Sequence, residues 1–275
     1  MKMLNSPFRW VGGKSRLRKY IIPVFPAHEC YVEPFGGAGW VMFGKERSKV
    51  EIFNDLDQEV VNFFRVVKGR PADLLQAFKW EIVSRAEFDR LAALDPRELD
   101  EVARAHRFYY IIMACWGGEL KHPRFQTSII DGGGANRLIG ALCALEDRIA
   151  PIHDRLRSVL IENLSWQECI DRYDRAGVLM YIDPPYPGNK CNYFHNMRSQ
   201  SDHLELAERL ANTKCKWVLS SYDREDIHIM YEGFWMMPLR SMSGMKKSDS
   251  TSRVENKELL VMNFKPNISL DIDLD

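Results

Sequence analysis

Hydrophobic residues gather along this chain in short runs that are separated by longer amphipathic stretches. Several runs lack strict alternation of apolar and polar positions, which is typical of strands covered by helices on both faces. The runs predict strands at 30–35, 49–53, 158–163, 177–183, 216–221 and 258–264. Helical periodicity between them predicts helices that include 58–68, 141–157 and 202–212. This strand–helix–strand order predicts an α/β fold with a doubly wound, Rossmann-like sheet.

The middle of the chain departs from this alternation, because residues from about 57 to 120 have helical periodicity only. The following stretch, 117–138, is rich in glycine, basic and aromatic residues. We therefore expect a mainly helical insertion with an irregular loop, carried by the α/β unit. Within 102–140, five lysines and arginines outnumber two acidic residues. This surplus suits contact with nucleic-acid phosphates, although a charged run is also common on a solvated surface.

Composition narrows the class of protein. The 275 residues are 45% hydrophobic and 28% charged, as expected of a globular protein with one large or two modest domains. The net charge of zero excludes a wholly basic nucleic-acid coat but allows a local cationic face. The longest apolar run, 108–116, is too short to span a membrane, and the N-terminus lacks the apolar centre of a signal peptide. We therefore expect a cytoplasmic protein that does not associate with membranes.

The six cysteines are scattered, without a CxxC pair or a nearby pair of histidines. This spacing predicts reduced thiols, with neither a disulfide framework nor a zinc site. We expect no metal cofactor.

Gly12-Gly13-Lys14-Ser15 is similar to the end of a phosphate-binding Walker A loop. Such a loop also needs a glycine at position 8, where the chain has Phe8, and a hydrophobic strand before it, which is absent. We therefore favour a glycine turn before a helix that begins near Ser15 over a nucleotide-triphosphate site.

The segment 31–43 is a predicted strand ending in Glu33-Pro34, then a glycine-rich turn and an apolar helix. Glycines 36, 37 and 39 would let the backbone approach a ligand at the strand's carboxyl end, although tight turns without a ligand are common. Asp55 follows the next strand, where a carboxylate is well placed to accept hydrogen bonds from ribose hydroxyls. The alternative is that Asn54-Asp55 caps the following helix.

The segment 178–190 runs from an apolar strand into Asp183-Pro184-Pro185-Tyr186. Proline has no N–H and a fixed φ, so carbonyls at this turn stay free to accept hydrogen bonds. Asp183 adds an anionic acceptor, and Tyr186 adds a flat face for stacking. The tetrapeptide is therefore suited to hold a planar heterocycle by its exocyclic amino group, the alternative being a plain Pro-Pro turn with a surface tyrosine.

Together these motifs resemble the Dam-type DNA adenine-N6 methyltransferases, and they occur in that family's order. The similar segments are 7–17 and 31–43 (cofactor motifs), 53–57 (ribose contact), 160–170 (cofactor adenine), 181–186 (catalytic motif) and 254–264 (closing strand). The resemblance implies a Rossmann-like methyltransferase domain formed by residues 1–56 and 138–275. It also implies an inserted target-recognition domain at 57–137. The recognition stretch departs from the family's pattern, so the family's target sequence is not carried over.

The resemblance implies S-adenosyl-L-methionine as the cofactor. Lys14 would pair with its carboxylate or with acidic groups of the site, and Asp55 would hold its ribose. For Glu33 the alternative role is to cap the following turn, and for Leu164 it is ordinary core packing. The implied cofactor-binding residues are Trp10, Lys14, Glu33, Pro34, Gly36, Gly37, Gly39, Asp55, Asn163, Leu164 and Asp183.

The same resemblance makes Asp183, Pro184, Pro185 and Tyr186 the catalytic residues, with Asp183 and the Pro184 carbonyl accepting both N6–H bonds of adenine. The adenine would be flipped out of double-stranded DNA and stacked on Tyr186. The loop 187–199 would close over it, or is an ordinary polar loop. The predicted DNA-binding residues are Arg107, Lys121, Arg124, Lys190, Tyr193, Arg198, Lys246 and Lys247.

Several alternatives stay open at this point. Cytosine-N4, RNA and glutamine methyltransferases place Ser or Asn more often where this chain has Asp183. A DNA-binding protein that senses S-adenosylmethionine without catalysis is a different class. The resemblance allows a cognate restriction endonuclease as a further partner, and we expect a monomer or weak dimer.

Overall fold

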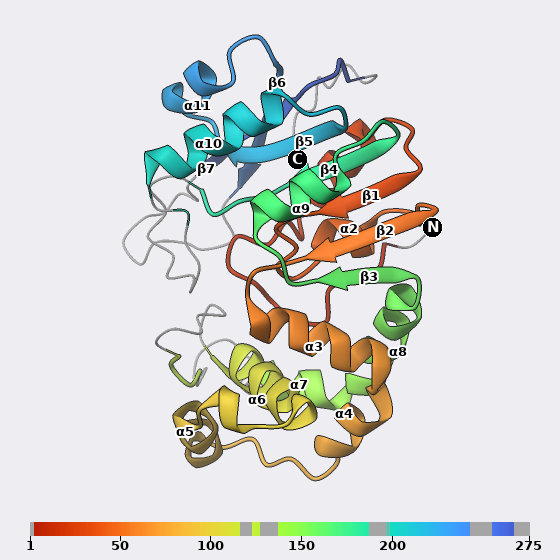
Figure 1. Ribbon diagram of the computed structural model, residues 1–275. Coiled ribbons are helices and arrows are strands. Elements are labelled where there is room, and N and C mark those ends of the chain that lie inside the picture. The colour runs from red at the N-terminus through yellow and green to blue at the C-terminus, as the bar shows by residue number, and fades with distance from the viewer. Residues whose placement is uncertain are drawn as a thin grey trace.

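The computed structural model describes residues 3–115, 123–126, 137–186, 197, 199–242 and 255–266. Within these ranges a seven-stranded sheet has the order β3-β2-β1-β4-β5-β7-β6 (Figure 1). Strands β1 to β5 run parallel, and β7 is antiparallel to both of its neighbours. The mixed sheet confirms the predicted α/β fold. Its strands are β1 Cys30–Glu33, β2 Val50–Asn54, β3 Val159–Glu162, β4 Val178–Ile182, β5 Lys216–Tyr222, β6 Trp235–Met242 and β7 Glu255–Met262.

Both faces of the sheet are apolar, because successive residues of a strand point to opposite sides. On β4, Leu179 and Tyr181 belong to one buried cluster, whereas Met180 and Ile182 belong to the other. Burial on both faces explains why the strand sequences are nearly continuous in hydrophobic residues.

Helices cover each face and produce three layers. The first cluster includes residues of α1, α2, α3 and α8, and the second includes residues of α9, α10 and α11. Side-chain caps start several of them: Asp57 accepts the Glu59 N–H at the start of α3, and Ser165 and Glu168 form a capping box at the start of α9. The bounds are α1 Arg18–Ile21, a 3₁₀ turn Ile22–Val24, α2 Trp40–Gly44, α3 Gln58–Gly69, α8 Leu145–Leu156, α9 Trp166–Tyr173, α10 Gln200–Ala211 and α11 Glu225–Met230.

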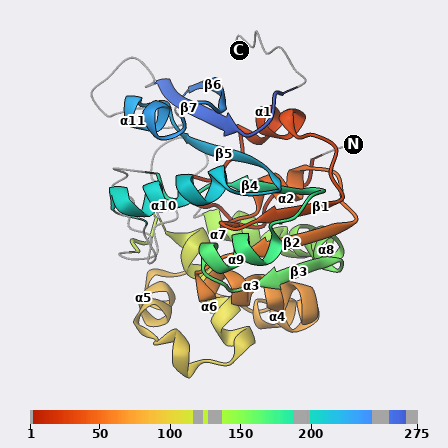
Figure 2. The same cartoon turned by 45° about the horizontal axis from the view of Figure 1, so that its top comes forward.

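The remaining helices form a module on one side of the molecule, which both views place away from β6 and β7 (Figures 1 and 2). They pack chiefly through contacts of α6 with α3, α4, α5 and α7. Their bounds are α4 Pro71–Ala77, α5 Arg85–Ala93, a 3₁₀ turn Pro96–Glu98, α6 Glu101–Ala114 and α7 Arg137–Cys143.

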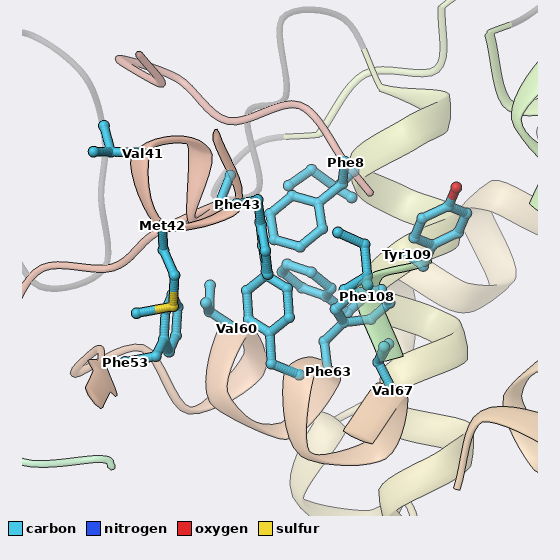
Figure 3. Close-up of a cluster of buried hydrophobic side chains, with 14 of the residues drawn as sticks. Phe8, Val41, Met42, Phe43, Phe53, Val60, Phe63, Val67, Phe108 and Tyr109 are labelled. Atoms are coloured by element: carbon cyan, nitrogen blue, oxygen red, sulfur yellow. The ribbon is translucent and has the colours of Figure 1, made fainter. Parts of the chain in front are cut away.

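Aromatic rings join this module to the sheet domain (Figure 3). The Phe8 ring lies 5.3 Å from Phe63 of α3 and 5.2 Å from Phe108 of α6, between ring centroids. Phe63 also stacks on Tyr109 at 5.6 Å. One hydrophobic cluster therefore joins residues on both sides of the predicted domain boundary at residue 57. The division into a domain of residues 1–56 and 138–275 and an insertion at 57–137 stays a prediction.

Two helices and one strand differ most from the elements predicted from the sequence. The predicted helix 141–157 is two helices, because Ala144 between α7 and α8 has a non-helical backbone with φ −116° and ψ 21°. The helix expected near Ser15 begins at Arg18. Strand β6 was not predicted, and it contains Pro238, which is tolerated because β6 lies at the sheet edge. No helix in the described part of the chain is long and apolar enough to cross a membrane.

Candidate active site

The winding of the sheet reverses between β1 and β4, since β2 and β3 extend to one side and β5 to the other. Such a reversal leaves a crevice beyond the carboxyl ends of the two central strands, where open α/β sheets bind ligands. A cavity of about 590 Å³ lies there, lined by the segments that follow both strands. This volume is in the range of cofactor and substrate sites.

All but one of the predicted cofactor-binding and catalytic residues line this one cavity. Asn163 is the exception: its amide donates to the backbone carbonyls of Asp55 (2.8 Å) and Leu56 (3.2 Å), so it supports the segment beside the cavity. The predicted residues that line the cavity are Trp10, Lys14, Glu33, Pro34, Gly36, Gly37, Gly39, Asp55, Leu164, Asp183, Pro184, Pro185 and Tyr186.

The glycines after β1 are required by protein packing, whereas the sequence suggested close approach to a ligand. A Cβ on Gly36 would lie 2.3 Å from the Phe53 ring, and one on Gly39 would lie 2.6 Å from the Phe43 ring. Gly39 also has φ +66°, a left-handed conformation that other residues adopt at a cost. The turn is therefore held tightly against the core, and its other side faces the cavity.

Asp55 follows β2 and contacts this turn. The alternative that Asn54-Asp55 caps the next helix is wrong, because Asp57 takes that role. The Asp55 carboxylate accepts the N–H of Gly37 (2.7 Å) and of Asp57 (2.8 Å). Burial and the nearby Asp57 carboxylate raise the pKa of Asp55 to about 7, against the effect of these backbone donors. The Leu56 backbone also donates to this carboxylate, and its two oxygens together keep acceptor capacity for a further donor in the cavity.

Asn54, next to Asp55, ties together the ends of three strands. Its amide donates to the Pro34 carbonyl (2.8 Å), and its oxygen accepts the Leu164 N–H (2.8 Å). It thereby positions the glycine turn after β1 against the segment after β3.

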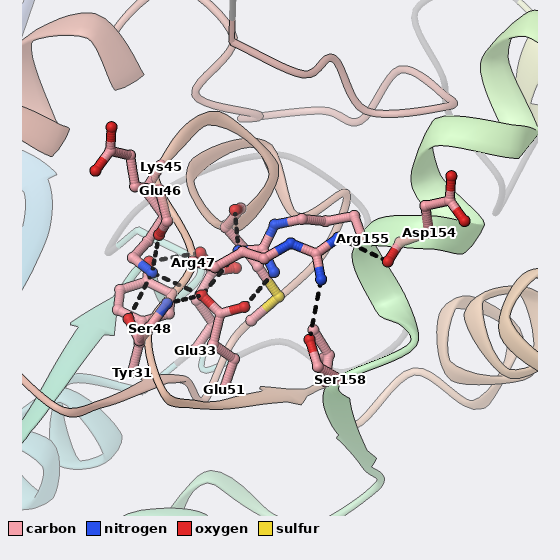
Figure 4. A network of polar contacts seen from close by, with 12 residues as sticks. Tyr31, Glu33, Lys45, Glu46, Arg47, Ser48, Glu51, Asp154, Arg155 and Ser158 are labelled. Carbon is pink, nitrogen blue, oxygen red and sulfur yellow. Dashed lines mark hydrogen bonds and ion pairs between the residues drawn. The ribbon is translucent and has the colours of Figure 1, made fainter. Parts of the chain in front are cut away.

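Glu33 has a buried carboxyl at the end of β1 (Figure 4). The Tyr31 hydroxyl donates to it at 2.7 Å, and it also hydrogen-bonds the backbone of Met42 in the first turn of α2. Burial raises the pKa of Glu33 to about 8, despite these hydrogen bonds and the charge of Lys45. Glu33 therefore contacts the first turn of α2, whereas the alternative prediction gave it the cap of the preceding glycine turn, and it also lines the cavity.

Lys14 pairs with the catalytic-motif carboxylate. Its Nζ lies 2.8 Å from Asp183 Oδ1 and donates to the Gly12 carbonyl at 2.8 Å. Burial lowers the pKa of Lys14, but the carboxylates of Asp183 and Glu258 outweigh it, so this pKa lies above its ordinary value. The Ser220 hydroxyl also donates to Asp183 Oδ1 at 2.8 Å. Both donors meet the same oxygen, which leaves Oδ2 facing the site.

Tyr186 is only 8% exposed, so it is not the surface tyrosine of the alternative prediction. Its stacking on a base stays a prediction. Its hydroxyl donates to Glu258 Oε2 at 2.9 Å. Its ring lies edge-on to Tyr222 at 4.6 Å, and Lys14 Nζ is 4.8 Å from the ring centroid.

The cavity favours cationic over anionic ligands. Among the described residues that line it, six are acidic and Lys14 is the single basic one. A triphosphate would meet repulsion from those acidic side chains that are ionised, whereas a ligand with positive charge would be attracted to them. Among all the residues that the structure describes, no group of three or more His, Cys, Asp or Glu side chains could hold a metal ion.

Two of the predicted DNA-binding residues are described. Arg107 donates to the carbonyls of Leu91 (2.8 Å) and Ala92 (3.3 Å), so part of its guanidinium holds the end of α5. Arg124 is exposed on the short segment 123–126. The DNA contacts stay a prediction. The other predicted contacts, Lys121, Lys190, Tyr193, Arg198, Lys246 and Lys247, lie outside the described residues, as does most of the loop 187–199.

Sequence reasoning did not name Tyr222 of β5 and Glu258 of β7, which line the cavity. It also did not name Ser220 of β5, which donates to Asp183 without lining the cavity itself. Glu258 begins an apolar run in the sequence, a weak signal. Because β7 is antiparallel, its early residues lie at the same sheet edge as the carboxyl ends of the parallel strands.

The family described as D12 class N6 adenine-specific DNA methyltransferase matches residues 10–245. The type II methyltransferase M.CviBI of Paramecium bursaria Chlorella virus NC1A is 22% identical over 82% of this chain and 86% of its own length. A DNA adenine methylase of Salmonella typhi is 26% identical over 81% of this chain and 82% of its own length. The DNA adenine methylase of Escherichia coli K12 is 23% identical over 98% of both chains. The chain belongs to the D12 class of N6 adenine-specific DNA methyltransferases.

Proposed function

We propose that this methyltransferase uses S-adenosyl-L-methionine to methylate N6 of an adenine that has been flipped out of duplex DNA. The observation that supports this most is that one cavity joins the glycine turn after β1 to Asp183 and Tyr186 after β4. A base stacked in a duplex cannot enter such a cavity, so it has to leave the helix first.

The acidic lining fits this cofactor, which when bound supplies an electrophilic methyl group on a positively charged sulfur. Glu33 and the turn from Gly36 to Gly39 would hold its methionine part, and Asp55 would accept from its ribose. Leu164 would border its adenine. Lys14, the single basic residue among the described lining, would pair with its carboxylate.

The chain's own groups orient the target nitrogen. Ser220 and Lys14 hold Asp183 through Oδ1, so Oδ2 and the Pro184 carbonyl would accept the two N6–H bonds. Accepting both hydrogens withdraws the lone pair from the ring and exposes it to the methyl group. Such orientation and preset electrostatics supply most of the acceleration in a direct displacement. The methylated nitrogen is acidic and loses one proton readily, so Asp183 need not be a strong base.

The test is Asp183→Ala, measured by transfer of tritium from labelled cofactor to unmethylated DNA. We expect the rate to fall about a thousandfold, while calorimetric binding of the cofactor changes little. Asp171→Ala is the matched control, since that carboxylate is 61% exposed on α9 and lies away from the cavity. An Asp183→Ala enzyme that transfers tritium near the wild-type rate would refute this mechanism.

The same assay separates the remaining alternatives. A protein that only senses the cofactor would bind it and transfer nothing. Methylation of cytosine or of RNA would place the tritium in a different nucleoside after digestion, and the family match argues for adenine.

Double-stranded DNA is the proposed partner. Relatives from a Chlorella virus and from Lactococcus lactis are named type II methyltransferases. We therefore keep a cognate restriction endonuclease as a second proposed partner, to be sought as restriction of unmethylated DNA by the source cells. Size-exclusion chromatography would test the expected monomer or weak dimer.

A further inference from the structure

Glu258 is a carboxylate in the cavity wall that the mechanism above does not use. It lies on β7, paired in register with Tyr222 of β5, and its side chain reaches the same cavity as Asp183. Neither the catalytic motif nor the cofactor motifs contain it.

We propose that Glu258 is a positioning residue, which holds the Tyr186 ring through its hydroxyl in the orientation that receives the flipped base. The proposal rests on the stacking role of Tyr186 given above.

The contacts around Tyr186 explain why a distal anchor matters. A tyrosine side chain turns about two torsions, and its hydroxyl oxygen lies on the axis of the second. A hydrogen bond to the hydroxyl therefore fixes where the ring lies, whereas the groups packed against the ring limit the rotation of its plane. Pro184-Pro185 fixes the backbone before it. The Tyr222 ring packs edge-on against it, with 4.6 Å between the ring centroids, and limits its rotation. The hydroxyl of Tyr186 donates to Glu258 Oε2 at 2.9 Å, which anchors the far end of the ring.

The charges around Glu258 support the same role. Burial raises the pKa of Glu258, and the nearby Asp183 adds to this, whereas Lys14 and the Tyr186 hydroxyl lower it. Lys14 therefore lies between two carboxylates and on the face of the ring. Lys14 thus offsets part of the effect of burial on the Glu258 pKa and favours the ionised carboxylate, the form that accepts the stronger hydrogen bond.

A purely structural role for Glu258 predicts different behaviour. A carboxylate that only stabilised β7 would change the folded fraction and leave the kinetics of the folded enzyme alone. A positioning role predicts that Glu258 and the Tyr186 hydroxyl act as one unit, so their deletions are not additive.

The experiment is a double-mutant cycle with Glu258→Ala, Tyr186→Phe and the double variant, followed by methyl transfer to unmethylated DNA. We expect each single change to lower kcat/KM for DNA about tenfold, the effect of one charge-assisted hydrogen bond. The double variant should fall no further. Glu258→Gln keeps an acceptor oxygen and should recover part of the loss. Cofactor binding should change less than about twofold in all variants.

Glu232→Ala, at an exposed position before β6, is the matched control and should keep the wild-type rate. Additive losses in the cycle, or a Tyr186→Phe enzyme within twofold of wild type, would overturn the proposal. The Tyr186→Phe result decides the matter even where Glu258→Ala fails to fold, because this variant keeps every charge. A wild-type enzyme that transfers no tritium to DNA would instead contradict the proposed function.

Discussion

Two lysine–carboxylate pairs lie at opposite ends of the strands, and of the two only the pair at the carboxyl ends lines the cavity. Lys45 and Glu51 lie at the amino ends of the strands, with side chains 4% and 1% exposed. Lys14 and Asp183 lie at the carboxyl ends, 5% and 19% exposed. Both pairs consist of one lysine and one carboxylate. Whether a pair can also bind a ligand must therefore depend on its surroundings.

The amino-edge cluster is closed by its own protein partners (Figure 4). Glu51 accepts from Lys45 (2.7 Å), from the Ser48 N–H (3.0 Å) and from two nitrogens of Arg155. Arg155 in turn donates to the Met42 carbonyl at 3.0 Å. Both carboxylate oxygens of Glu51 therefore have protein donors, and the cluster joins α8 to β2.

The carboxyl-edge cluster is incomplete. Both donors to Asp183 meet Oδ1, and no described residue donates to Oδ2. An ion pair by itself therefore does not mark an active site. Unused acceptor capacity that faces a cavity does, because a ligand can complete it.

The largest effect should come from breaking the closed cluster. Glu51→Ala leaves two buried cations without their carboxylate, and we expect a loss of about 3–5 kcal/mol in the free energy of unfolding. Asp183→Ala should cost less than Glu51→Ala, because Lys14 lines the cavity and the nearby Glu258 carboxylate still offsets its charge. Urea denaturation measures both. Comparable losses in the two variants would contradict the distinction drawn here.

A second prediction concerns Glu33, which is connected to both clusters. Tyr31 donates to Glu33, and Lys45 Nζ lies 4.3 Å from the Tyr31 ring centroid, while Glu33 lines the same cavity as Asp183. With a folded-state pKa of about 8, the native state keeps this proton while the unfolded chain releases it near its ordinary value of 4.5. Wild-type stability from this group is therefore complete at low pH and falls as pH rises from 4.5 to 8, by at most about 1.4 kcal/mol per unit.

Glu33→Gln removes this titration, so the variant should gain stability relative to wild type as pH rises from 5 to 8. Thermal unfolding of both proteins across this range measures the difference. Parallel curves would show that Glu33 is already ionised in the native protein.

The smallest effect concerns a pair of intermediate burial. Arg104 of α6 donates to Glu59 of α3 at 2.6 Å, with side chains 21% and 16% exposed. Arg104→Ala should cost about 1–2 kcal/mol, between the values for exposed and buried pairs. Lys49→Ala, which breaks the exposed pair with Glu29, is the control and should leave the denaturation midpoint unchanged. A larger loss for Lys49 than for Arg104 would show that burial does not set the order.

The strands and the catalytic motif were predictable because their signals are local. An apolar run that ends in Asp183-Pro184-Pro185-Tyr186 specifies both a buried strand and the groups at its end. The strand β6 was not predictable in this way, since Pro238 normally argues against a strand and only the edge position permits it. The sequence left two roles open for Asp55, ribose contact or a helix cap, because it does not say which carboxylate turns toward the Gly37 N–H and which caps α3.

The sequence by itself determined the chemistry at the ends of β1 and β4, because hydrophobic periodicity and proline geometry act over a few residues. Only the tertiary structure decided which partners complete that chemistry. Ser220 reaches Asp183 because β5 lies beside β4, and Glu258 reaches Tyr186, 72 residues away, because β7 enters antiparallel. Strand order and direction depend on packing of the whole chain, and no local pattern encodes them.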